Sequence, residues 1–62
     1  MPTKKEFGAV IRAARKALRM TQAELAVQLN VPQQSIARWE RGEHYPNYES
    51  MKRLCDVLDL AA

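Results

Sequence analysis

The feature that most constrains this chain is a three-residue connection, Asn30-Val31-Pro32, between two short segments with helical patterns. Asparagine adopts the left-handed conformation that ends a helix more readily than most other residues. Proline presets the backbone for the start of a new helix. Two short helices joined so closely cannot lie antiparallel, so we expect them to cross steeply. A steep crossing needs a small residue at the contact, and Ala26 is suitably placed for it.

Helix signals on both sides of this connection predict an all-α chain of four helices. Thr3 with Glu6, and Thr21 with Glu24, match the capping box that opens a helix. Gly42 suits the end of the third helix. The predicted helices span about residues 4–18, 22–29, 33–41 and 48–58. Apolar residues at helical spacing give the expected inward faces: Phe7, Ile11, Ala14, Leu18, Leu25, Ala26, Leu29, Ile36, Trp39, Met51, Leu54, Cys55 and Leu58.

The length of 62 residues is that of one domain, and we expect residues 1–62 to form a single one. A domain this small buries only about 60% of the surface of its unfolded chain, which leaves little room for a deep substrate pocket. The single cysteine, Cys55, cannot form an internal disulfide, and no apolar run is long enough to span a membrane. We therefore expect a cytoplasmic protein that makes no membrane contact.

The charge is distributed unevenly along the chain. The net charge is +3, and residues 1–23 carry six basic side chains against one acidic side chain. One side of the molecule could therefore be positive and attract an anionic partner. An ordinary solvated surface would explain the same distribution.

The third predicted helix begins with polar residues that contribute little to a core. Ile36 and Trp39 fall on its inward stripe, which leaves Gln33, Gln34 and Arg38 on the outward side. A side-chain amide can pair with N6 and N7 of adenine, and a guanidinium can pair with O6 and N7 of guanine. The alternative interpretation is that these polar residues only form a soluble, weakly capped helix start.

The segment TQAELAVQLNVPQQSIARWERG, with IRAARKALRM before it, resembles the helix-turn-helix domain of phage repressor and Cro-type regulators, the XRE family. The resemblance covers about residues 7–60. It implies a lambda-repressor-like fold of four helices, with room for a short fifth turn. It also implies a nucleoid-associated protein of a prokaryote or phage, whose third helix enters the major groove of double-stranded DNA. Symmetric, inverted-repeat operators imply a homodimer.

The resemblance implies two sets of DNA-contacting residues. In the first set, Gln33 is the first choice for an adenine contact, and Gln34 could reach a neighbouring base or a thymine methyl. Arg38 could bind guanine or fall back on a phosphate. The second set positions the protein on the DNA backbone and contains Thr21, Gln22, Ser35, Arg41, His44 and Asn47. The hydroxyls of Thr21 and Ser35 could instead serve only the protein backbone.

The resemblance also implies a structural ion pair. The family carries an arginine in its first helix and a glutamate near the end of its third, and Arg15 and Glu40 match them. Removing one partner of such a partly buried pair would strand a charge, so we assign Arg15 to the fold and not to DNA. Trp39 is likewise expected in the core.

Two features depart from the family. Arg19 stands where many relatives have glycine, so the turn between the first two helices should be either less tight or slightly strained. The sequence ends where many relatives continue into a fifth helix that helps two subunits pair. We therefore expect a homodimer that is weak or forms only on DNA.

The leading hypothesis is that the protein is a sequence-specific transcriptional regulator, most simply a repressor. A protein-interaction module on the same scaffold, antitoxin-like or polymerase-contacting, is the alternative that the modest net charge allows. We do not expect an enzyme, a cofactor or a metal, because the one histidine and one cysteine lie in different segments without clustered carboxylates.

Overall fold

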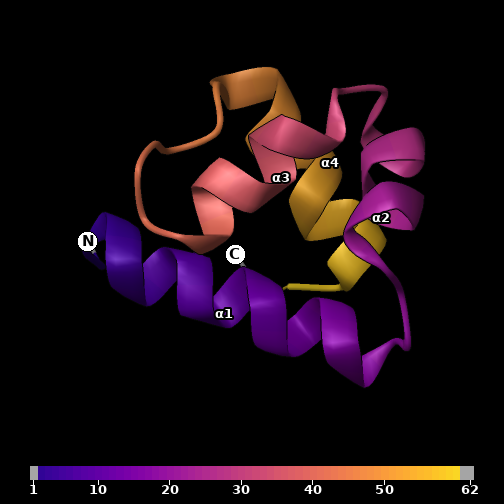
Figure 1. Ribbon diagram of the computed structural model, residues 1–62, viewed down its shortest axis with the longest axis horizontal. Coiled ribbons are helices and arrows are strands. Elements are labelled where there is room, and N and C mark those ends of the chain that lie inside the picture. The colour runs from indigo at the N-terminus through magenta and orange to yellow at the C-terminus, as the bar shows by residue number, and fades with distance from the viewer. Residues whose placement is uncertain (1, 61–62) are drawn as a thin grey trace.

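Four helices make up the regular structure of residues 2–60, the part of the chain that the computed structural model describes (Figure 1). They are α1 (Lys4–Ala17), α2 (Gln22–Leu29), α3 (Gln33–Glu40) and α4 (Tyr48–Leu58). The predicted all-α class and all four helices are confirmed. α1 and α3 each end one residue earlier than predicted, because Leu18 and Arg41 act as C-caps.

The predicted helix starts are confirmed in detail. Thr3 Oγ1 accepts from the Glu6 backbone N–H at 3.1 Å, and the Glu6 carboxylate accepts from the Thr3 N–H at 2.9 Å. Thr21 and Glu24 form the same reciprocal pair at 3.0 and 2.8 Å. Each box satisfies two backbone donors that a helix start leaves without partners, so each fixes where its helix begins.

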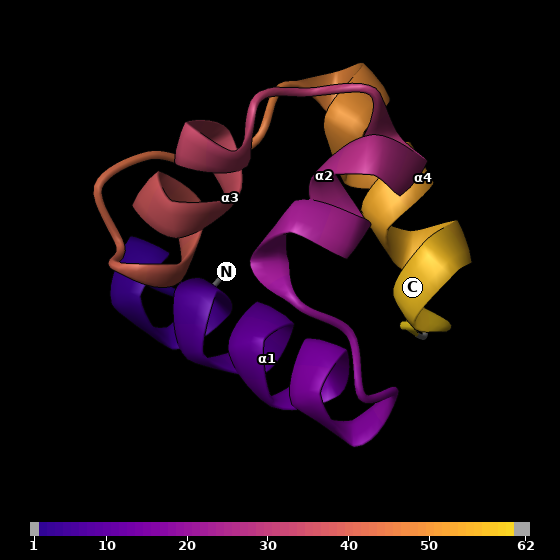
Figure 2. The same cartoon turned by 45° about the vertical axis from the view of Figure 1, so that its right-hand side comes forward.

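The connection between α2 and α3 has the geometry that its sequence predicts (Figure 2). Asn30 is left-handed, with φ 56° and ψ 46°, and its N–H bonds the carbonyls at the end of α2. Pro32 is the N-cap of α3 rather than its first helical residue, with φ −64°. Ala26 is buried, as the crossing requires.

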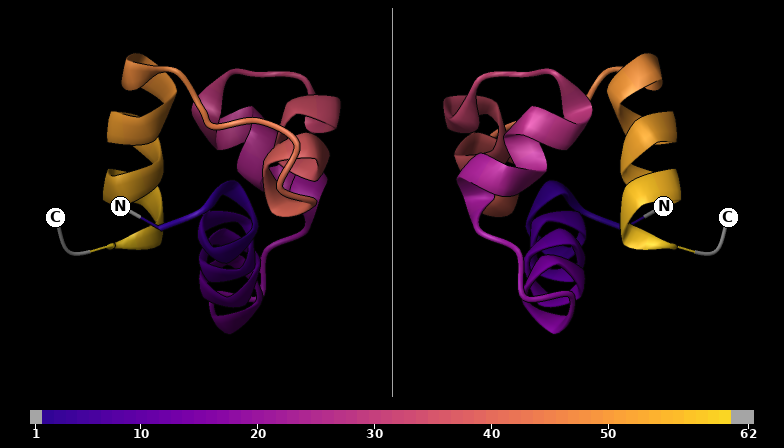
Figure 3. Two further views of the ribbon diagram at one scale, coloured as in Figure 1. Left: turned by 90° about the vertical axis from the view of Figure 1, so that its left-hand side faces the viewer. Right: turned by 90° about the vertical axis from the view of Figure 1, so that its right-hand side faces the viewer.

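α3 packs against both α1 and α2, and α4 contacts α2 and α1 (Figures 1 and 3). In Figure 3, α1 is seen nearly end-on, with α4 on one side of it and α3 on the other. The core between the helices consists of Ile11, Leu25, Ala26, Leu29, Ile36, Trp39, Leu54 and Leu58. Trp39 is therefore a core residue, as expected, whereas Cys55 is only half-buried and does not belong to the core. Leu18, also expected to face inward, is exposed because it is the C-cap of α1 and lies past its last turn.

Gly8 allows α1 to approach the end of α3 closely. A Cβ atom at this position would lie only 2.8 Å from the Glu40 carbonyl oxygen and would also collide with the carbonyl oxygen of Trp39. Such a separation is shorter than van der Waals contact, so any larger residue would push the two helices apart. The position of α3 therefore depends on a glycine in α1.

The turn between α1 and α2 is strained, one of the two outcomes that the sequence allows. Arg19 adopts a left-handed conformation with φ 58°, which is unfavourable for a residue with a Cβ atom. At the other end, Asp59 closes α4 with φ 55°. No further helix follows α4 within residues 2–60, and residues 61–62, where a fifth turn would continue, lie outside the described part.

Candidate nucleic-acid interface

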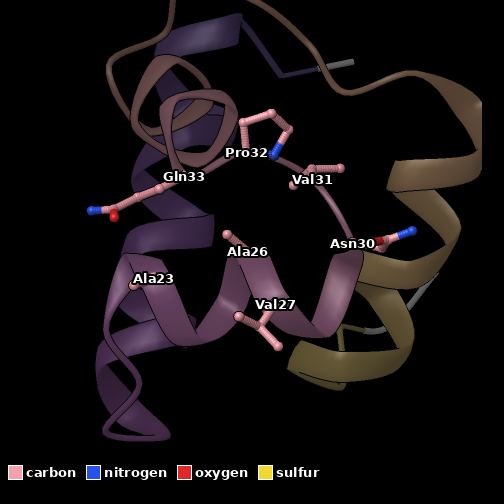
Figure 4. Close-up of a pocket in the computed structure, with 7 residues that line it drawn as sticks. All are labelled: Ala23, Ala26, Val27, Asn30, Val31, Pro32 and Gln33. Carbon is pink, nitrogen blue, oxygen red and sulfur yellow. The ribbon is translucent and has the colours of Figure 1, made fainter.

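The outward face of α3 carries the three residues that the sequence assigns to base reading. Gln33, Gln34 and Arg38 are all exposed. Within residues 2–60, none of their side chains takes part in a hydrogen bond or an ion pair. Figure 4 shows the Gln33 amide pointing away from the turn and from its neighbours. The amides and the guanidinium are therefore available to an external partner.

A polar hollow of about 310 Å³ lies between α3 and the loop that follows it. Ser35 and Arg38 line it from α3, and His44 and Asn47 line it from the loop. The fold thus brings together four predicted DNA-contacting residues from two segments. The side-chain oxygen Oδ1 of Asn47 accepts from the Ser50 N–H at 2.8 Å as the N-cap of α4, and the side-chain N–H groups of Asn47 have no partner among residues 2–60.

The loop beside this hollow is held against α1 and the residues just before it. The Tyr45 hydroxyl donates to the Pro2 carbonyl at 2.6 Å, and its ring lies 6.0 Å from the ring of Phe7. Gly42, with φ 79°, packs closely on Lys5. His44 and Asn47 are therefore carried by a loop that α1 holds in place, although both side chains are exposed.

Arg15 and Glu40 form the ion pair expected from the sequence. Arg15 Nε donates to Glu40 Oε2 at 2.6 Å and Nη2 donates to Oε1 at 3.0 Å, so the contact is bidentate. Arg15 Nη1 also donates to the Met20 carbonyl at 2.8 Å. The side chains are only 9% and 4% exposed. Hydrogen bonding to Glu40 raises the pKa of Arg15 above its ordinary value, so this guanidinium stays charged.

Gln22 also bonds to Glu40, and this third contact was not predicted from the sequence. Its Nε2 donates to Glu40 Oε1 at 3.1 Å, so one carboxylate connects α1, α2 and α3. We call Arg15, Gln22 and Glu40 the buried node. An amide group has two N–H donors and a carbonyl, so the second N–H and the carbonyl of Gln22 remain for another contact. Gln22 is the first residue of α2, where free backbone N–H groups and the helix dipole favour an anion.

The remaining predicted phosphate contacts lie at the ends of the same helices. Thr21 is the exposed N-cap of α2. Its hydroxyl oxygen accepts from the Glu24 backbone N–H, and its O–H can still donate to another group. Ser35 is half-buried in the first turn of α3. Arg41 is the exposed C-cap of α3, and its Nε donates to Glu43 Oε2 at 2.6 Å. Glu43 is not among the residues predicted for the site, although its charge, opposite to that of Arg41 and two residues away, could have indicated the pair.

No group of three His, Cys, Asp or Glu side chains among residues 2–60 could hold a metal ion. No helix among these residues is both long and apolar enough to cross a membrane.

α2 and α3 cross steeply, since Figure 4 shows α2 lying across the view and α3 nearly end-on. A steeply crossed helix pair with a short connection and an exposed polar second helix is the architecture of a helix-turn-helix. A family described as helix-turn-helix matches residues 11–61. The chain belongs to this family, in its XRE-type branch of phage repressor and Cro-like proteins.

Two characterised relatives extend this result. The chain is 43% identical over 47 residues to the HTH-type transcriptional activator BcrR of Enterococcus faecalis, and this match covers 76% of the chain and 23% of the relative. The chain is also 41% identical over 52 residues to Repressor protein C2 of Salmonella phage P22, and that match covers 84% of the chain and 24% of the relative. The matches therefore span about a quarter of each relative's length. No solved structure gave a significant match.

Proposed function

We propose that this chain is a sequence-specific DNA-binding transcriptional regulator that reads the major groove with α3. One observation carries the proposal: Gln33, Gln34 and Arg38 are exposed on α3 and have no side-chain partner within residues 2–60. A domain this small gains nothing for its core from these side chains. Their donors and acceptors match the edges of adenine and guanine in the major groove.

The backbone contacts would lie on both sides of α3. Thr21 and Gln22 would bind one phosphate at the start of α2, where the helix dipole is positive. Ser35, His44 and Asn47 would approach another phosphate at the polar hollow, and Arg41 would add a contact from the end of α3. Contacts of this kind set the register of the protein on the duplex and do not read its sequence.

We propose repression as the output, through occupation of a promoter by a homodimer on an inverted repeat. One named relative is a repressor and the other is an activator. Repression requires less of the chain than activation does, since an operator-bound domain can exclude polymerase without any further contact surface. A promoter–reporter assay with the selected site placed inside or upstream of the promoter tests this choice.

The test of DNA recognition is selection of bound duplexes from a random pool, followed by binding measurements on the selected site. Gln33→Ala and Arg38→Ala should each weaken binding by about 1–3 kcal/mol and relax the base preference at one position. Gln22→Ala should weaken all duplexes evenly. Gln28→Ala and Arg12→Ala are matched controls, because both residues are exposed on other helices. An unchanged selected sequence for both α3 variants would contradict base reading by α3.

A protein-interaction module remains the second candidate, and one observation favours it. An open, largely apolar hollow of about 600 Å³ is lined by α2, the α2–α3 connection and the first residue of α3 (Figure 4), and Val27 in its lining is 79% exposed. Val27→Asp separates the two functions. If the module binds a toxin or a polymerase subunit through this hollow, the variant loses regulation in cells but retains operator binding in vitro.

A further inference from the structure

Glu43 is an acidic residue among the residues proposed to contact DNA phosphates. It follows Arg41 and Gly42 and precedes His44, in the loop after α3. Its backbone N–H donates to the Arg38 carbonyl at 2.9 Å, which holds the start of the loop against the last turn of α3. Its side chain therefore emerges beside the proposed interface.

The Glu43 carboxylate pairs with one arginine and is influenced by the charges of other basic groups. Its Oε2 accepts from Arg41 Nε at 2.6 Å. This hydrogen bond, and the charges of Arg41, Arg38 and His44, hold the pKa of Glu43 below its usual range, so it is ionised at neutral pH. One negative charge thus offsets part of the positive field that a phosphate would meet.

This pair has little to contribute to folding. The side chains of Arg41 and Glu43 are 61% and 46% exposed, and exposed pairs are weakened by solvent and by salt. The pair uses only the Nε of Arg41, and neither Nη group has a hydrogen-bond partner within residues 2–60. A phosphate that binds the Nη groups would therefore share the cation with the carboxylate.

We propose that Glu43 restrains the binding of Arg41 to the DNA backbone and so lowers the affinity of the chain for duplex DNA of any sequence. This inference rests on the proposed function. A phosphate that approaches Arg41 meets the carboxylate as a like charge, and the positive charge of Arg41 is already partly neutralised. Removing Glu43 frees one cation for phosphate binding and counterion release.

The test measures binding of the full chain to a fluorescent random-sequence duplex over a range of salt concentrations. Glu43→Gln keeps the shape of the side chain and removes its charge. We expect its affinity to rise about three- to ten-fold at low salt, and the slope of log K against log salt to steepen by about 0.9, the value for one more phosphate contact. Glu49→Gln is the matched control, because Glu49 also pairs with an arginine, Arg53, but on α4. This control should not change either quantity.

A double variant shows whether the effect acts through Arg41. If Glu43 restrains Arg41, Glu43→Gln should raise affinity much less when Arg41 is already Gln. An equal gain in both backgrounds would overturn the proposed route, as would a Glu43→Gln variant that matches Glu49→Gln. Weaker binding by Glu43→Gln would overturn it in the opposite direction, because it would mean that the carboxylate orients Arg41 toward DNA.

Different results would contradict the role of Glu43 and DNA binding itself. A wild-type chain that binds no duplex even at low salt contradicts DNA binding itself. A wild-type chain that binds DNA, together with a Glu43→Gln variant of unchanged affinity, contradicts only the role of Glu43. Thermal unfolding of each variant checks that the fold is retained, which the exposure of Glu43 leads us to expect.

Discussion

Two arginine–glutamate pairs in this molecule have the same shortest distance and very different surroundings. Arg15 Nε and Arg41 Nε each lie 2.6 Å from a glutamate Oε2. The first pair is almost completely buried between three helices, and the second is exposed at the end of α3. Water cannot solvate a buried charge that loses its partner, whereas it readily solvates an exposed one. The comparison shows that burial, not distance, decides whether such a pair holds the fold or remains available for binding.

The largest expected effect comes from breaking the buried pair. Glu40→Ala leaves Arg15 buried without a counter-charge and removes the partner of Gln22, so the free energy of unfolding should fall by about 3–5 kcal/mol. Small domains have total stabilities of about the same size, so much of this variant should be unfolded. Chemical denaturation followed by circular dichroism measures the change. Glu43→Ala is the control and should leave the stability close to that of wild type, because its pair is exposed. A similar loss in both variants would remove the distinction.

Gly8→Ala tests whether the close approach of α1 to α3 supports the buried pair. The added methyl group would meet the Trp39 and Glu40 carbonyl oxygens, so α1 must move away from the end of α3. We expect a net loss of about 1–3 kcal/mol, although alanine is the better helix former. Denaturation measures the loss, and crystallography of the variant would show whether the Arg15–Glu40 contact lengthens. A gain in stability would mean that the helices tolerate the methyl group.

Arg19→Gly should stabilise the turn beside the buried node. Its φ of 58° costs an arginine about 1 kcal/mol that a glycine avoids. Part of this gain is offset by the greater freedom of glycine in the unfolded chain. Arg19→Ala is the control, because it removes the same charge and keeps the unfavourable backbone. A thermal melt in which both variants gain equally would assign the effect to charge and not to conformation.

The smallest expected effect concerns the exposed pair and its dependence on pH. The pKa of Glu43 is lowered in the folded protein, chiefly by its hydrogen bond with Arg41. The stabilisation from this carboxylate is therefore present above its unfolded-state pKa and is lost as the pH falls through the lowered, folded-state pKa. An NMR titration should show that Arg41→Gln raises the pKa of Glu43 toward its ordinary value. An unchanged pKa would assign the lowering to Arg38 and His44.

The fold was predictable where its signals are local. The capping boxes at Thr3 and Thr21, the left-handed Asn30 and the stop at Gly42 each depend on residues no more than a few positions apart. These interactions form within one turn of the chain, so the sequence records them directly. The strain at Arg19 was one of two outcomes that the sequence left open, because many members of the family have glycine at its position.

The site was predictable only in part, since its geometry depends on how the helices pack. Exposure of Gln33 and Arg38 followed from the apolar stripe of α3. The bond between Gln22 and Glu40 joins residues 18 positions apart on different helices, and no local pattern indicates it. The pairing of Arg15 with Glu40, 25 positions apart, was expected only through the family resemblance. Cys55 was misplaced because a residue at the edge of an apolar stripe can be half-buried.

The bond between the Tyr45 hydroxyl and the Pro2 carbonyl has a practical consequence for experiments with this protein. It ties the beginning of the chain to the segment that presents His44 and Asn47. A purification tag fused ahead of Pro2 would crowd this attachment and could distort affinity measurements without changing any side chain of α3. Tagged material should therefore be compared with protein from which the tag has been cleaved.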